Sequence, residues 1–279
     1  MPGIGFYIKD AWPEGPGAWT TENNLSQGRY GLGGAGLQDS ALAFGGRNVS
    51  TNYSTSEEYN GVSWAAGGSL SETKMYVMGT GSQTAALCVG GNGTASRVEE
   101  YNGSAWSLGG STSIDRQYHP GTVGTQTAGM TWSGPSAGSA TSEKYDGASW
   151  SSGDDLNSTR RYGADGGTQT AAFSAGGYSD LTTTEEYNGN AWVYGGNLNT
   201  GRHYLSGSGN SSHGLSFGGY SGGTQQTTEE YNDSVWTAGG NMSINRYQLA
   251  GAGTQIDALA FGGRTGSTGF QTTESYSIS

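Results

Sequence analysis

The chain has 279 residues, of which 53 are glycine and only five are proline. This glycine content is far above the usual ~7%, but it has no Gly-X-Y period, which excludes a collagen-like fold. The 17 tyrosines and eight tryptophans supply area that can be buried and argue against disorder. The formal net charge of −11 disfavours nucleic acid as a partner, because phosphates need a basic surface.

Cysteine usage and hydropathy exclude further classes of protein. Cys88 is the single cysteine, so no internal disulfide can form. The sequence contains no run of 18 apolar residues, so we expect no transmembrane helix. Residues 1–10 lack a basic start followed by an apolar run, and we therefore expect no Sec-type signal peptide.

The first segment in chain order, residues 1–16, lies outside the repeated pattern that follows it. We expect it to form a tail that could attach the protein to a larger particle. Its apolar side chains are the candidate contacts for attachment: Phe6, Tyr7, Ile8 and Trp12.

From residue 17 onward the sequence predicts short strands joined by tight turns. A strand around Trp19 is followed by a strand predicted to start at Arg29, and the next one ends at the diglycine Gly45-Gly46. A third strand ends at Tyr59, and an Asn-Gly turn then leads to a fourth strand with Trp64. Asn-Gly suits the left-handed conformations that close a hairpin.

This unit returns along the rest of the chain. The repeat tyrosines are 42 to 45 residues apart, at Tyr59, Tyr101, Tyr145, Tyr187, Tyr231 and Tyr276. A diglycine after a short apolar run occurs in five copies, and the third copy has Ser133-Gly134 instead. A basic residue follows each tryptophan by ten positions, at Arg29, Lys74, Arg116, Arg160, Arg202 and Arg246. Four strands recurring every ~40–50 residues are typical of a propeller blade.

The order diglycine, Glu-x-Tyr, Trp and basic residue resembles the kelch repeat over residues 17–279. This resemblance implies an all-β, six-bladed propeller with four strands per blade and the tryptophans packed between blades. The repeats begin with a fourth-strand tryptophan, Trp19, and finish with a third strand at Tyr276. The N-terminal strand should therefore complete the last blade and leave no free sheet edge.

The loop between the second and third strands varies most in length. Between the second glycine and the first glutamate there are 10, 7, 8, 7, 9 and 10 residues, whereas the tyrosine-to-tryptophan spacing is constant. Exposed loops on a rigid scaffold often bind ligands, although neutral drift would produce the same variation. On this basis the candidate ligand-binding residues are Arg47, Tyr53, Tyr178, Asp180, Tyr220, Arg264 and Phe270.

The six basic residues are predicted to form a ring near the channel mouth on the same face. They could attract a carboxylate ligand, or they could hold strand ends and pair with neighbouring carboxylates. Their recurrence in every blade favours the structural interpretation. The same reasoning applies to the glutamates two residues before each repeat tyrosine: Glu57, Glu99, Glu143, Glu185, Glu229 and Glu274. The remaining charge is acidic, which disfavours anionic partners.

The sequence gives little support for catalysis. The recurring acids belong to every blade, and the histidines His119, His203 and His213 lack metal-ligand spacing. Kelch propellers include copper oxidases, but Cys88 lies in a predicted core strand without a supporting histidine pair. We therefore expect no enzyme activity, no metal and no cofactor. A glycoside hydrolase, which needs two carboxyls ~5–10 Å apart, is the weakest alternative.

The repeat contains the sequences Gly-Thr-Gln-Thr-Ala, Phe-Gly-Gly and Thr-Glu-Glu-Tyr-Asn-Gly. In this it resembles the repeats of kelch-like proteins of marine bacteriophages, which are described as tail-fibre or other virion proteins. The resemblance implies a virion component, made in a host cytoplasm, that contacts other virion proteins or a host-surface glycan or protein. It would be an appendage or a decoration protein. A free lectin-like or peptide-binding module is the alternative.

Overall fold

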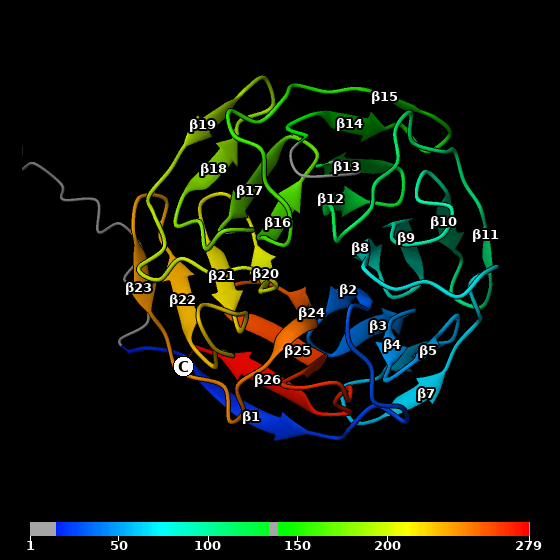
Figure 1. Cartoon of the computed structure of the whole chain (residues 1–279), viewed down its shortest axis with the longest axis horizontal. Helices are drawn as coiled ribbons and strands as arrows, with labels where there is room; N and C mark the ends of the chain where they lie inside the picture. Colours follow the sequence, from blue (N-terminus) through cyan, green and yellow to red (C-terminus); the bar gives the residue numbers. More distant parts are fainter. Residues whose placement is uncertain (1–14, 134–138, 279) are drawn as a thin grey trace, which may run out of the picture.

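A computed structural model of the chain describes residues 15–133 and 139–278. Six four-stranded antiparallel sheets are arranged around a common axis, as Figure 1 shows. The prediction of an all-β, six-bladed propeller is therefore confirmed. Among the described residues, no helix is long and apolar enough to cross a membrane.

Within each blade the first strand in the chain lies nearest the axis, and the following strands lie progressively nearer the rim. Blades one and two contain β2 (Gly33–Leu37), β3 (Ser40–Phe44), β6 (Ser56–Tyr59) and β7 (Trp64–Ala66), then β8 (Val77–Ser82), β9 (Ala85–Gly90), β10 (Val98–Tyr101) and β11 (Trp106–Leu108). Blades three and four contain β12 (Gly121–Thr125), β13 (Ala128–Trp132), β14 (Ser142–Tyr145) and β15 (Trp150–Ser152), then β16 (Ala164–Thr168), β17 (Ala171–Ala175), β18 (Thr184–Tyr187) and β19 (Trp192–Tyr194). Blades five and six contain β20 (Ser206–Gly209), β21 (Gly214–Phe217), β22 (Thr228–Tyr231) and β23 (Trp236–Ala238), then β24 (Tyr247–Gly253), β25 (Asp257–Arg264) and β26 (Thr273–Ser277). A small hairpin, β4 (Arg47–Asn48) and β5 (Thr51–Asn52), lies in the first variable loop.

The N-terminal strand closes the propeller. β1 (Ala18–Glu22) pairs with β26 at the rim of blade six, from Ala18 opposite Ser277 to Glu22 opposite Thr273. Each inner strand also contacts the inner strands of both neighbouring blades, including β24 with β2. The predicted closure is confirmed, and it removes the sheet edge that an open array would expose.

Five of the six inner strands begin later than the sequence predicted. The first was expected to start near Arg29, but β2 starts at Gly33. The intervening Gly31 has a φ of 60°, which is the left-handed region and interrupts the extended backbone. The equivalent residue of every other blade has the same conformation, although in blade six this residue, Gln248, lies within β24, which begins directly after Arg246.

The diglycine is explained by its backbone conformation. Gly45 has a φ of 62°, and the residue at this position has a positive φ in every blade. Glycine adopts this conformation without the steric cost of a Cβ. Ser133, which replaces the glycine in blade three, keeps the left-handed conformation with a φ of 77°. The substitution therefore does not alter the local fold.

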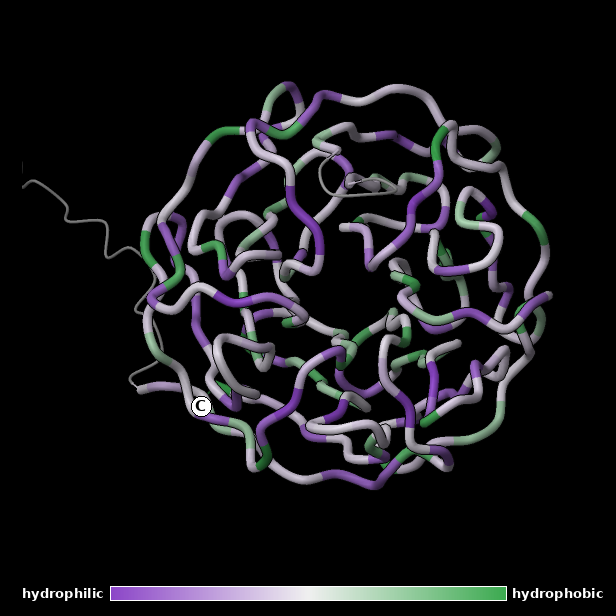
Figure 2. Tube along the Cα trace, viewed as in Figure 1, coloured by the Kyte–Doolittle hydropathy of each residue, from purple (hydrophilic) through white to green (hydrophobic). Residues whose placement is uncertain are grey.

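The hydrophobic core lies between blades rather than within them. Trp106 of blade two packs against Phe44 of blade one with ring centroids 4.8 Å apart, and Trp236 of blade five packs against Phe173 of blade four at 5.8 Å. Cys88 is fully buried in the same core. Figure 2 shows hydrophobic segments among the inner strands and also at several points of the perimeter. The expected packing of the tryptophans between blades is confirmed.

A glutamine clamp reinforces five of the six seams. In the turn between the first two strands, Gln126 donates its side-chain N–H to the carbonyls of Ala86 and Tyr101 in the preceding blade, at 3.2 and 2.7 Å. The equivalent clamp residues are Gln38, Gln83, Gln169 and Gln255. Blade five has Ser211 at this position. The sequence motif Gly-Thr-Gln-Thr thus specifies a contact between blades as well as a turn.

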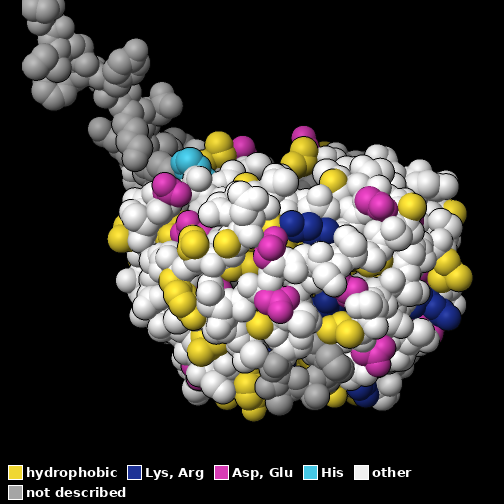
Figure 3. Space-filling view, turned by 90° about the horizontal axis from the view of Figure 1, so that it is seen from above, with side chains coloured by type: hydrophobic (Ala, Val, Ile, Leu, Met, Phe, Trp, Pro, Cys, Tyr) yellow, Lys and Arg dark blue, Asp and Glu magenta, His cyan; other side chains and the backbone are white. Residues whose placement is uncertain are grey.

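The rim of the disc is polar and mixed. Figure 3 shows acidic side chains scattered among polar ones, with hydrophobic side chains singly or in small groups. Exposed apolar residues on or beside the outer strands include Leu108, Val193 and Tyr194. Scattered apolar residues of this kind need no ligand to explain them.

Candidate functional site

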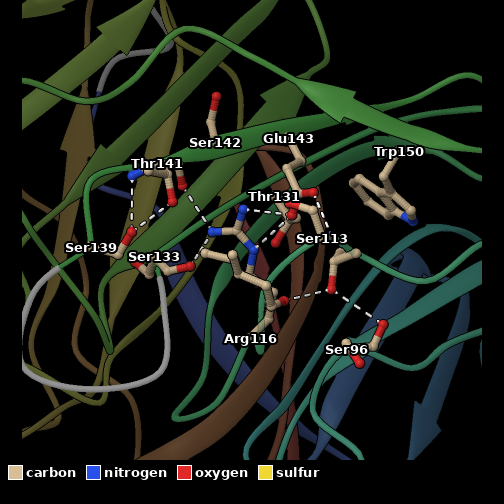
Figure 4. A network of polar contacts seen from close by, with 12 residues as sticks. Ser96, Ser113, Arg116, Thr131, Ser133, Ser139, Thr141, Ser142, Glu143 and Trp150 are labelled. Carbon is tan, nitrogen blue, oxygen red and sulfur yellow. Dashed lines mark hydrogen bonds and ion pairs between the residues drawn. The ribbon is translucent and has the colours of Figure 1, made fainter.

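The six basic residues of the repeat are buried and do not line an open channel mouth. Arg116 donates to the carbonyls of Ser133 and Thr141 and pairs with the Glu143 carboxylate at 2.8 Å, as Figure 4 shows. The same buried pair recurs as Arg29–Glu57, Arg160–Glu185, Arg202–Glu229 and Arg246–Glu274, at 2.7 to 2.9 Å. These guanidinium groups hold the ends of the second and third strands together. They are not accessible to a ligand from solvent.

Blade two is the exception. Lys74 lies 3.5 Å from Glu72 and donates to the carbonyl of Arg97 at 3.3 Å. Glu99, which occupies the position of the paired glutamates, keeps one buried oxygen, Oε1, without a hydrogen bond. A lysine has no planar fork, so it cannot reproduce the contacts that arginine makes in the other blades.

A closed circle of backbone hydrogen bonds surrounds the axis on the variable-loop face. Each blade contributes one residue, and its N–H donates to the carbonyl of the next. The circle consists of Gly31, Gln248, Tyr204, Tyr162, His119 and Tyr76, with the last N–H returning to Gly31. All six residues have φ between 56° and 63°. Five of them are not glycine, and such strained conformations persist only where the surrounding structure enforces them.

An aromatic belt spreads outward from this circle across blades two to six. It consists of eight rings in mutual contact: Tyr76, Tyr118, Tyr162, Tyr178, His203, Tyr204, Tyr220 and Tyr247. The closest pair, Tyr162 and Tyr204, has centroids 4.1 Å apart. Exposure is highest at Tyr178, Tyr118 and Tyr220, at 51%, 37% and 36%. The belt therefore presents aromatic surface to solvent on a rigid support.

Two arginines lie against different parts of the belt. The Arg161 guanidinium is 4.2 Å from the ring centre of Tyr178, and it also contacts Tyr118 and Tyr162. The Arg264 guanidinium is 4.1 Å from the ring centre of Tyr30 and 4.9 Å from that of Tyr247. Cation–π contact fixes the direction of each side chain without neutralising its charge.

The predicted ligand-binding residues divide into two groups. Tyr178, Tyr220 and Arg264 lie in or against the aromatic belt, and the Asp180 carboxylate accepts a hydrogen bond from Nδ1 of His203 at 2.7 Å.

The second group lies apart from the belt. Arg47 contacts the Val49 carbonyl and the Met75 sulfur, and Tyr53 lies under the Arg29 guanidinium. Phe270 is half-buried, and its backbone bonds to Arg29 and Gly263. The proposed attachment residues Phe6, Tyr7, Ile8 and Trp12 lie outside the described residues.

Most of the belt was not predicted from the sequence as a binding site. The unpredicted members are Tyr76, Tyr118, Tyr162, His203, Tyr204 and Tyr247, and Arg161 beside them was not predicted either. The sequence does contain a pattern that could have identified the belt tyrosines, because a tyrosine follows the basic residue by one or two positions in all six blades. The comparison of loop lengths drew attention to a different loop on the same face.

Two cavities lie along the axis beneath the belt. The first, of about 50 Å³, is lined by His119, Thr122, Asp165 and Ser206 together with glycines and apolar residues of the inner strands. The second, of about 150 Å³, extends toward the opposite face and shares Thr122 and Asp165. In four other blades the position equivalent to Asp165 is a glycine, because the inner strands pack closely there. A Cβ at Gly79, for example, would lie 2.4 Å from the Gly34 carbonyl oxygen.

Asp165 is the one carboxylate among the described residues that line these cavities. Burial raises the pKa of its carboxyl to about 6, although the Ser174 hydroxyl donates to it and Arg160 lies nearby. Burial also lowers the pKa of His119 to about 4, and neither of its ring nitrogens has a hydrogen bond. His119 is therefore neutral near pH 7.

The described residues include no group of three or more His, Cys, Asp and Glu side chains that could hold a metal ion. Comparison with models of known protein families and with curated proteins gives no match. The fold and the belt define the chain as a β-propeller, a class of rigid scaffold suited to binding or structural roles.

Proposed function

We propose that this β-propeller is a non-enzymatic binding protein that contacts its partner through the aromatic belt. The observation that supports the proposal most directly is the belt itself, because exposed tyrosines on a rigid support bind with a low entropic cost. The first and last strands of the propeller pair within one blade, so no blade lacks its outer strand.

The proposal extends to the setting in which the protein acts. The likeness of its repeats to kelch-like phage proteins supports a bacteriophage virion component, either an appendage that contacts the host surface or a decoration protein. Residues 1–16 would attach it to the particle. Deleting them should abolish incorporation into particles while leaving the isolated propeller folded. Normal incorporation of the shortened chain would contradict this role.

The binding role is tested with isolated protein on host cells and on a glycan array. Replacing Tyr178 and Tyr220 by alanine should weaken binding at least tenfold, because each removes aromatic contact area from the belt. Tyr194→Ala is the matched control, since Tyr194 is a comparably exposed tyrosine on the rim strand β19. Equal effects of the belt and rim variants would contradict the proposed face.

A free lectin-like or peptide-binding module is the alternative, and it uses the same face. It predicts strong binding by isolated protein and no incorporation into particles. Catalysis by a glycosidase mechanism is disfavoured, because the described lining of the axial cavities offers Asp165 without a second carboxylate.

A further inference from the structure

We propose that the ligand of the aromatic belt is an acidic saccharide, with its carboxylates bound by Arg161 and Arg264 and its sugar rings stacked on the exposed tyrosines. The inference rests on the proposed function and names the chemical class that this face accepts. It follows from the charges, the aromatic surface and the backbone bonding of the face, which are considered in turn.

The unpaired basic side chains are concentrated on this face. The chain has 12 lysines and arginines, and Lys9 lies outside the described residues. Of the other 11, eight form ion pairs: Arg29, Lys74, Arg97, Arg116, Lys144, Arg160, Arg202 and Arg246. The three that do not are Arg47, Arg161 and Arg264, and all three lie on the variable-loop face. Among the described residues of this protein of net charge −11, the unpaired positive charges thus lie on the face that carries the belt, and two of the three lie against it.

Arg161 and Arg264 are better placed for a ligand than Arg47. Arg47 already donates to the Val49 carbonyl at 3.1 Å. The other two guanidinium groups lie on tyrosine faces, and no hydrogen bond to their side chains occurs within the described residues. Arginine binds carboxylates through two parallel N–H donors, so each of these guanidinium groups can take a bidentate carboxylate.

The surface between the two arginines fits a sugar better than a peptide. Tyr118, Tyr178 and Tyr220 offer partly exposed rings with polar hydroxyls, which suit the apolar faces and hydroxyl edges of pyranose rings. An extended peptide gains affinity largely from main-chain hydrogen bonds. The N–H and carbonyl groups of the backbone circle are already bonded to one another, so they offer a peptide no such partners.

The overall negative charge of the protein restricts the size of the acidic ligand. A long polyanion would extend beyond the belt over a protein of net charge −11, and like charges in contact are unfavourable. Charges beyond about 8 Å are largely screened at physiological ionic strength, so a short acidic saccharide would interact mainly with Arg161 and Arg264 and with Asp180, whose carboxylate is paired with His203. The net charge therefore disfavours nucleic acid without disfavouring a small carboxylate ligand.

Titration calorimetry with oligogalacturonate and its carboxyl-reduced, neutral counterpart tests the proposal, and a sialylated glycan with its desialylated form provides a second pair. We expect at least one acidic member to bind at least tenfold more tightly than its neutral partner. Arg161→Gln and Arg264→Gln should each weaken that binding at least tenfold. Arg97→Gln removes the same charge from the same face, but Arg97 is paired with Glu72, and this control should change binding less than twofold.

The outcomes separate this inference from the proposed function. Equal binding of the neutral and acidic forms would overturn the inference that the saccharide must be acidic, and it would leave a lectin-like function intact. Binding of a polyglutamate peptide but of neither saccharide pair would overturn it in favour of a peptide ligand. If no probe binds while host cells still bind through the belt tyrosines, the ligand class is wrong and the proposed function stands. Equal urea midpoints for all variants show that any loss is not a loss of folding.

Discussion

The guanidinium of Arg246 donates to the carboxylate of Glu274 at 2.9 Å, and neither side chain is exposed to solvent. Burial lowers the pKa of Arg246 to about 10, and Glu274 acts in the opposite direction. Glu274 also accepts the backbone N–H of Ser243 at 2.7 Å, so each of its oxygens has a donor. The pair lies in the blade that closes the propeller, where it links the second strand, the third strand and the loop before the first.

Removing one partner of this pair should be far more damaging than removing both. Glu274→Ala leaves a buried uncompensated charge and should lower the free energy of unfolding by about 3–5 kcal/mol. Urea denaturation followed by tryptophan fluorescence measures the change. Arg97→Ala breaks a partly exposed ion pair and should cost at most about 1 kcal/mol. A double substitution of Arg246 and Glu274 by methionine as damaging as Glu274→Ala would contradict this explanation.

Lys74→Arg should stabilise blade two. An arginine there can reach the free Oε1 of Glu99 and the strand-end carbonyls, as its counterparts do in five other blades. One charged hydrogen bond gained in a buried site should raise the free energy of unfolding by about 1–2 kcal/mol. The same change at Lys144, which is half-exposed and already paired with Asp154, provides the control. Loss of stability in Lys74→Arg would show that the pocket cannot hold the larger side chain.

Asp165→Asn should stabilise the protein in a pH-dependent way. The folded pKa of about 6 is above the ordinary value of 3.8, so the folded state favours the protonated acid. This contribution is fully present below about pH 3.8 and is lost as the pH rises through about 6. The variant should therefore gain up to about 3 kcal/mol over the wild type at pH 8 and little at pH 3.5. A pH-independent difference would contradict burial as the cause.

His119 should have the opposite effect on acid stability. Its folded pKa of about 4 is below the ordinary value of 6.5, so the unfolded chain binds the proton more tightly. Stability should fall as the pH drops from about 6.5 to 4. His119→Gln should flatten this part of the curve of unfolding free energy against pH. An unchanged slope would show that another group causes the acid sensitivity.

Ser211→Gln should strengthen the seam between blades four and five. The other five blades have a glutamine at this turn position, and its N–H bridges two carbonyls of the preceding blade. We expect a gain of about 0.5–1.5 kcal/mol, and Gln126→Ala should lose a similar amount or more. Thermal denaturation of the three proteins tests both changes. A neutral Ser211→Gln together with a damaging Gln126→Ala would indicate that the seam is spaced differently.

The fold could be predicted because its causes are local and repeated. The positive φ at the diglycine and the tryptophan packing against the preceding blade recur with fixed spacing, so six copies reinforce one another. The position of Arg29 was harder to predict. Its recurrence indicated a structural role, but burial depends on the strand start at Gly33, which the left-handed Gly31 delays.

The candidate site was predicted only in part, for two physical reasons. The belt joins loops of five blades, and contacts such as Tyr204 with Tyr247 depend on how the blades pack. The lone acid Asp165 is visible in the sequence only if the inner strands are aligned, where other blades have glycine or threonine. Its effect on the cavity arises from burial, which the repeat pattern does not specify.

The backbone circle has a mechanical consequence for any partner of the belt. The six backbone hydrogen bonds form a closed loop, so a force on one blade is transmitted to both of its neighbours. No single blade can tilt without breaking two of these hydrogen bonds. Thermal motion should accordingly be smallest at the axis and grow toward the perimeter. The tyrosines would therefore be preorganised before a partner binds, and little of the binding free energy would be needed to order them.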